Sequence, residues 1–201
     1  MFIIAAIGSL VIAQVNRAND RKARNWMLVG WAMLALGTLT KGLVALVLPA
    51  ASIVVYSIWQ RDINIWKKSL LIRGPLLFLL IVSPWFIAVS NANPEFAQFF
   101  FIHEHLERYT SGVHNREGPI YYFIPYLVLG VCPWLVISMK SVFSPGFKWK
   151  TTNPGDFHPE RFLWTFVVVT FCFYSLGQSK LPAYILPIIP IIAVISGGRI
   201  A

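Results

Sequence analysis

The sequence predicts an all-α membrane protein, a polytopic transmembrane helical bundle with about seven spans. Of its 201 residues, 57% are hydrophobic and only 12% are charged, and the mean hydropathy is +0.64. This composition is far more apolar than that of a soluble domain. The apolar residues also form successive runs that are long enough, or nearly so, to cross roughly 30 Å of hydrocarbon.

Four predicted spans lie in the first half of the chain, over residues 1–15, 26–40, 43–59 and 69–90. The stretch between the first two carries four basic side chains and one aspartate, which predicts a cytoplasmic loop. Only Thr40-Lys41-Gly42 separates the second span from the third. We interpret it as a short outer turn, because a single long span would leave a lysine at the centre of the bilayer.

Three further spans are predicted over residues 121–139, 162–177 and 183–196. The resulting topology places every basic residue on the inner side except Lys41, Arg108, Arg116 and Lys180. Cytoplasmic loops of membrane proteins are enriched in Lys and Arg. Topology therefore explains the net charge of +9, and no nucleic acid partner is expected. The four outer cations need another explanation.

Residues 91–122 form the longest polar interruption, and we predict that they are an outward-facing juxtamembrane loop and the functional centre. Three of the four histidines lie in this loop. Its first half, from Pro94, has the pattern of an amphipathic helix lying in the membrane interface. The apolar face of that helix would consist of Phe99, Ile102, Leu106 and Tyr109.

Two interpretations of the charged residues in this loop stay open. Glu104 and Arg108, at i and i+4, could form an exposed ion pair worth about 0.3–0.5 kcal/mol. Alternatively, Arg108 and the outer lysines could converge on a phosphate at the membrane boundary, with arginine offering a bidentate fork and lysine a point charge. Lys41 by itself could equally extend from a short span to the interface.

A divalent metal is a further possibility at His103 and His105, which have carboxylates beside them in the sequence. Two histidines are not a closed ligand set, and side chains at i and i+2 point apart on a helix. The sequence contains no P-loop, dinucleotide fingerprint or HExxH motif, so chemistry on soluble nucleotides has no support.

Three segments have a recognisable order and spacing: Leu39–Gly42 with Pro49, residues 99–109 continued by His114–Pro119, and Gln178–Pro187. Together they resemble the polyprenyl-phosphate-dependent GT-C membrane glycosyltransferases, the family of aminoarabinose lipid A transferase and the protein O-mannosyltransferases. The resemblance covers nearly the whole chain.

The resemblance implies a GT-C-like fold in the bacterial inner membrane, with the active side facing the periplasm. A sugar would pass from a polyprenyl-phosphate donor to lipid A, a protein or a glycan, as in a hexosyl or pentosyl transferase. Lys41 and Arg108 would hold the donor phosphate, and Lys180 and Tyr184 would line the cavity near it. Cations placed there would stabilise the negative charge that develops on the leaving phosphate.

One part of the family pattern is missing. In the family the acidic catalytic residues lie in an outer loop before these spans, and nothing here matches that loop. We therefore expect residues 1–201 to be a single transmembrane region of a larger enzyme, without its catalytic carboxylate. The alternative is a segment of a transporter or flippase for an anionic or lipid-linked substrate, although the sequence shows no convincing internal repeat.

Overall fold

The computed structural model describes residues 1–67, 69–100, 118–132, 136 and 156–198. All regular elements of these residues are helices, which confirms the all-α class. The first half contains α1 (Phe2–Val15), α2 (Asp20–Lys41), α3 (Val44–Gln60), α4 (Asn64–Lys67), α5 (Arg73–Ala92) and α6 (Phe96–Gln98). The second half contains η2 (Ile120–Tyr122), α8 (Phe123–Val131), α10 (Pro159–Leu176), η4 (Pro182–Ile185) and α11 (Ile188–Gly197).

Each predicted span overlaps one of the longer helices, but several boundaries differ from the prediction. Within the described ranges, α5 alone combines the length and the apolarity of a membrane crossing, with 20 residues and a hydropathy of 1.8, while the other apolar helices are shorter. α5 begins at Arg73, where a start at Ser69 was predicted. Most of the predicted amphipathic helix, including residues 101–109, lies outside the described residues.

The ends of α2 follow from its sequence and fix the position of Lys41. The Asn19 side chain caps the N-terminus by accepting a hydrogen bond from the Lys22 N–H at 3.0 Å, which satisfies a donor that has no partner within the helix. At the other end Gly42 has φ of 74°, a conformation that glycine adopts readily. The chain therefore turns sharply after Lys41 and enters α3.

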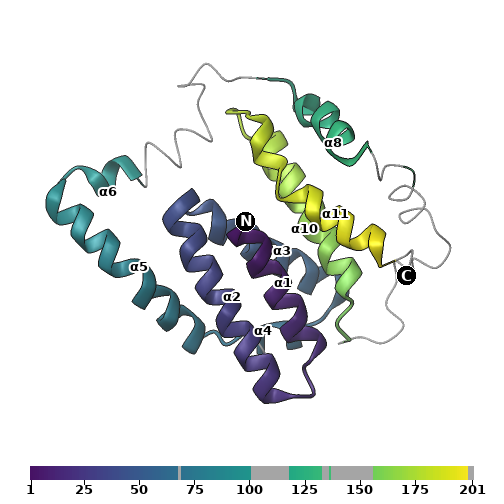
Figure 1. Ribbon diagram of the computed structural model, residues 1–201, viewed down its shortest axis with the longest axis horizontal. Coiled ribbons are helices and arrows are strands. Elements are labelled where there is room, and N and C mark those ends of the chain that lie inside the picture. The colour runs from purple at the N-terminus through teal and green to yellow at the C-terminus, as the bar shows by residue number, and fades with distance from the viewer. Residues whose placement is uncertain (68, 101–117, 133–135, 137–155, 199–201) are drawn as a thin grey trace.

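The helices pack as two groups (Figure 1). The N-terminal group consists of α2 with α1 and α5 packed against it, and the C-terminal group consists of α10 with α11, which also contacts α8. α3 follows α2 in the chain and packs against α10. This packing of α3 on α10 is the main contact between the N-terminal and C-terminal groups. The largest side chains buried at the junction and in the C-terminal group are Tyr56, Phe123, Phe162 and Phe166.

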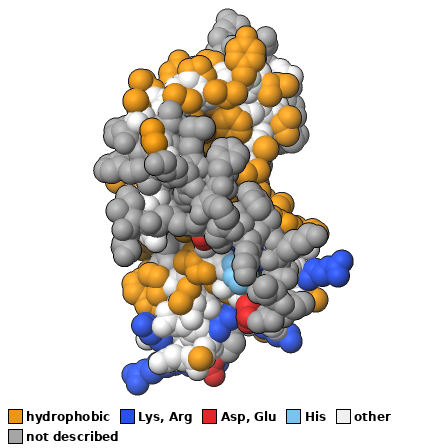
Figure 2. Space-filling view, turned by 90° about the vertical axis from the view of Figure 1, so that its right-hand side faces the viewer, with side chains coloured by type: hydrophobic (Ala, Val, Ile, Leu, Met, Phe, Trp, Pro, Cys, Tyr) orange, Lys and Arg blue, Asp and Glu red, His pale blue; other side chains and the backbone are white. Residues whose placement is uncertain are grey.

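The connections between helices lie at two ends of the bundle (Figure 1). We call the end with residues 16–19, 61–72 and 156–158 the inner end, and the end with Gly42 and residues 177–181 the outer end. Figure 2 shows Lys and Arg side chains gathered toward the lower, inner end of one face, with hydrophobic side chains above them. The basic residues from which a cytoplasmic position was predicted thus gather toward one end of the bundle.

The first turn of α5 rests on the indole of Trp31 from α2. A Cβ atom at Gly74 would overlap this indole ring, whose Nε1–H donates to the Ser69 carbonyl at 2.9 Å. We expect Gly74→Ala to displace Trp31 and to lower the free energy of unfolding by about 1–3 kcal/mol. Thermal unfolding of the full-length protein in detergent measures this loss.

Gly8→Ala in α1 is the matched control, because no atom lies within 4 Å of a Cβ at Gly8. Alanine is the better helix former, so this control should unfold no earlier than the unmodified protein. Equal unfolding temperatures for the two variants would contradict the close contact at Gly74.

Candidate functional site

Lys180 lies at the outer end, in the segment that connects α10 to η4, and only 5% of its surface is exposed. Its Nζ donates to the carbonyl of Ser175 at 2.8 Å and to that of Gly177 at 2.9 Å. Carbonyls at a helix C-terminus lack partners within the helix and carry the negative end of its dipole. The last turn of α10 thus holds a buried ammonium group in place.

One aromatic ring lies close to this lysine and leads to two more. The Phe123 ring centre lies 5.9 Å from Nζ, within the range of a cation–π contact. Tyr174 lies 6.4 Å from Phe123, and Tyr184 stacks on Tyr174 at 4.8 Å. Lys180 and Tyr184, which the family resemblance assigns to one cavity, are thus linked through the rings of Phe123 and Tyr174.

An anion bound at Lys180 would offset the cost of burying its charge. Burial lowers the pKa of its ammonium, because the charged form loses hydration. Carbonyls take up two of its three N–H donors, and no ion pair within the described part of the chain involves it. A phosphate oxygen at this position would accept the remaining N–H and supply the missing counter-charge.

An apolar groove of about 360 Å³ lies between α8 and the η4–α11 segment, which follows Lys180 in the sequence. One wall belongs to α8, with Tyr126, Leu129 and Gly130, and the other to η4 and α11, with Pro182, Leu186 and Ile189 among its residues. Pro182, one of the lining residues, is two residues from Lys180 in the sequence. A buried cation in the segment that leads into an apolar groove suits an amphiphile with an anionic head and a hydrocarbon tail.

Among the described residues, no hydrogen bond or ion pair joins Lys41 to Lys180. Lys41, the last residue of α2, is exposed, and its side chain makes no hydrogen bond or ion pair with any residue that the structure describes. α2 and α10 both end at the outer end (Figure 1), so Lys41 and Lys180 share that end of the bundle. Arg108, His103 and His105 lie outside the described residues.

Sequence reasoning missed a buried polar cluster at the inner end. Asp62, fully buried, pairs with Arg17 at 2.7 Å across 45 positions of sequence. The available signal was the lone carboxylate within the basic stretch 61–68. Among the described residues, neither this cluster nor any other place has a group of three or more His, Cys, Asp or Glu side chains that could hold a metal ion.

Known proteins are similar to this chain in both sequence and fold. Residues 1–100 match the family model of dolichyl-phosphate-mannose-protein mannosyltransferases. The crystal structure of ArnT from Cupriavidus metallidurans bound to undecaprenyl phosphate superposes with a TM-score of 0.87 at 36% identity, covering 96% of this chain and 34% of that one. This chain belongs to the GT-C family of polyprenyl-phosphate-dependent membrane glycosyltransferases. The resemblance in the three sequence segments is thereby confirmed.

Two curated relatives in the GT-C family extend the comparison. The undecaprenyl phosphate-alpha-4-amino-4-deoxy-L-arabinose arabinosyl transferase of Erwinia tasmaniensis is 33% identical over 190 residues, or 93% of this chain and 32% of the relative. The enzyme of the same name from Edwardsiella ictaluri is 30% identical over 203 residues, or 100% of this chain and 35% of the relative. The chain spans about a third of the length of these relatives.

Proposed function

We propose that the full-length protein transfers a sugar from a polyprenyl-phosphate donor to an acceptor on the periplasmic side of the bacterial inner membrane. The observation that carries this proposal is the buried Lys180 ammonium, which has one N–H donor that is not bonded to a carbonyl and which precedes the residues of an apolar groove in the sequence. The relatives' name favours undecaprenyl phosphate as the lipid and 4-amino-4-deoxy-L-arabinose as the sugar. Lipid A is the acceptor we expect, with a protein or a glycan as alternatives.

The proposed mechanism depends on the outer cations. Breaking the bond between the anomeric carbon and the phosphate oxygen leaves negative charge on the departing polyprenyl phosphate. Lys180, with Lys41 and Arg108, would stabilise that charge in a poorly hydrated site, where fixed cations act strongly. Tyr184 would help to shape the cavity. The carboxylate that activates the acceptor is expected elsewhere in the full-length enzyme.

We also infer that the seven longer helices cross the membrane with the inner end in the cytoplasm. The gathering of Lys and Arg toward the inner end supports this orientation. Lys41 and Lys180 would then face the periplasm, beside the loop formed by residues 91–122. The short apolar helices fit a crossing in which the connecting residues reach the interfaces.

Mass spectrometry of lipid A and envelope glycans from cells with and without the intact gene tests the proposed function. We expect a species that carries an aminopentose, most directly a modified lipid A, to be absent from cells without the gene. It should return when the gene is restored. Identical spectra would contradict a glycosyltransferase. Counterflow assays in vesicles examine the transporter alternative, which requires substrate movement without any glycosylated product.

The divalent metal at His103 and His105 stays a prediction. A metal-dependent enzyme would lose transfer after chelation and regain it with Mg²⁺ or Mn²⁺, and His103→Ala would weaken that recovery. Full activity in the chelator would argue against a required metal.

A further inference from the structure

The two outer lysines belong to different helix groups. Lys41 ends α2 in the N-terminal group, whereas Lys180 is bonded to the last turn of α10 in the C-terminal group. The groups meet chiefly where α3 packs against α10. The separation of the two lysines at the outer end therefore depends on how α3 and α10 are aligned.

Hydrogen bonds between buried groups fix this alignment at the inner end. The Tyr56 hydroxyl, on α3, accepts a bond from the backbone N–H of His158 at 2.8 Å. Arg161, on α10, donates from Nη1 to Oε1 of Gln60 at 2.6 Å. Tyr56 is fully buried, Gln60 is 1% exposed and Arg161 is 6% exposed. Sliding the helices would leave these polar groups buried without their partners, which is costly.

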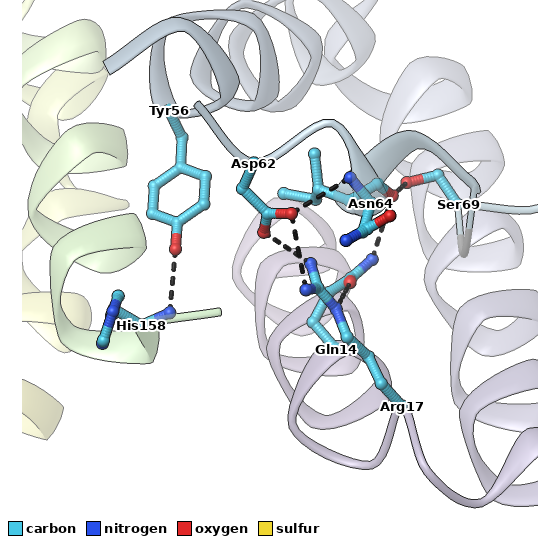
Figure 3. A network of polar contacts seen from close by, with 8 residues as sticks. Gln14, Arg17, Tyr56, Asp62, Asn64, Ser69 and His158 are labelled. Atoms are coloured by element: carbon cyan, nitrogen blue, oxygen red, sulfur yellow. Dashed lines mark hydrogen bonds and ion pairs between the residues drawn. The ribbon is translucent and has the colours of Figure 1, made fainter. Parts of the chain in front are cut away.

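Arg17 extends the contact to α1 (Figure 3). Its guanidinium pairs with Asp62, donates from Nε to the Gln14 side chain at 2.7 Å, and lies 5.3 Å from the centre of the Phe157 ring. Asp62 also accepts from the backbone N–H of Asn64 at 3.0 Å. Polar contacts thus join the end of α1 to the turn after α3, and the Arg17 guanidinium also meets Phe157 in the segment before α10.

We call the residues that make these contacts the inner clamp: Arg17, Tyr56, Gln60, Asp62, His158 and Arg161. We propose that the inner clamp sets the relative positions of Lys41 and Lys180 and so positions these two cations for the donor phosphate. Helix packing inside a bilayer has little hydrophobic driving force, so directional bonds between α3 and α10 have a large share in fixing their alignment. A small rotation or slide at the inner end then displaces Lys180 relative to Lys41. The inference rests on the proposed function of the outer site.

Tyr56→Phe and Gln60→Leu in the full-length enzyme loosen the clamp without touching the outer end. Small errors in alignment at a reacting centre cost roughly tenfold to a hundredfold. We expect the KM for the polyprenyl-phosphate donor to rise by about tenfold, while the KM for the acceptor stays constant. Gln60→Glu keeps an acceptor for Arg161 and should restore much of the donor affinity.

Thr170→Val is the matched control on α10. Its buried hydroxyl has no hydrogen-bond partner among the residues described, so its removal should leave both KM values unchanged. If Gln60→Leu does not accumulate in the membrane, Tyr56→Phe and Gln60→Glu still provide the comparison.

A double variant that combines Tyr56→Phe with Lys180→Met distinguishes a positioning role of the clamp from a general loss of structure. If the clamp acts through the outer cations, Tyr56→Phe adds little to the rise in donor KM that Lys180→Met causes. If the rises in donor KM caused by Tyr56→Phe and by Lys180→Met multiply fully in the double variant, the inference is overturned. It is also overturned if Tyr56→Phe has the same donor KM as the Thr170→Val control. If Lys180→Met and Lys41→Met both leave donor KM unchanged, the proposed function itself fails.

Discussion

Lys180→Met in the full-length enzyme is expected to lower the rate of sugar transfer by about 10²–10³-fold, the usual effect of removing one preorganised charge-stabilising group. Methionine fills a similar volume but cannot donate to a phosphate oxygen or balance its charge. The measurement is transfer by the purified enzyme in lipid vesicles, with a polyprenyl-phosphate sugar as donor.

Lys67→Met is the control for this prediction, because Lys67 is an exposed lysine at the inner end. It should transfer sugar at the unmodified rate. Equal rates for the Lys180 and Lys67 variants, at equal protein levels, would remove Lys180 from the site.

Arg108→Ala is expected to abolish transfer while leaving membrane insertion and protein level intact. An arginine fork can hold two phosphate oxygens at once, and alanine offers no replacement. Arg108 lies outside the described residues, so this prediction comes from its place in the sequence and from the family resemblance. Turnover and membrane-bound protein should be measured on the same preparation.

Glu104→Gln distinguishes the two interpretations of Arg108. If Arg108 only pairs with Glu104, the two variants should behave alike, with full activity and a loss of about 0.3–0.5 kcal/mol in stability. If Arg108 binds the donor phosphate, Glu104→Gln keeps its activity and Arg108→Ala does not.

The sequence predicted the helices well because bilayer length and apolar runs constrain them strongly. It placed the third span over residues 43–59, and α3 covers Val44–Gln60. The boundaries failed where hydropathy was not the deciding factor. α2 starts at Asp20, ahead of the predicted residue 26, because Asn19 caps a charged first turn. α11 starts at Ile188 because residues 182–185 form a 3₁₀ turn.

The site was less predictable, because its properties come from contacts between distant residues. Resemblance placed Lys180 in a cavity, but its burial and its bonds to the end of α10 depend on the turn after Leu176. The pairing of Arg17 with Asp62 could not be read from the chain: topology places both at the inner end, as it does most of the basic residues. Packing alone selects that partner.

The affinity of the purified full-length protein for undecaprenyl phosphate tests the central claim most directly. Native mass spectrometry can compare the unmodified protein with the Lys180→Met and Lys67→Met variants. Loss of one hydrogen bond to a charged group should weaken binding by about tenfold or more in Lys180→Met, while Lys67→Met binds normally. Unchanged affinity in Lys180→Met would contradict a phosphate site at the outer end.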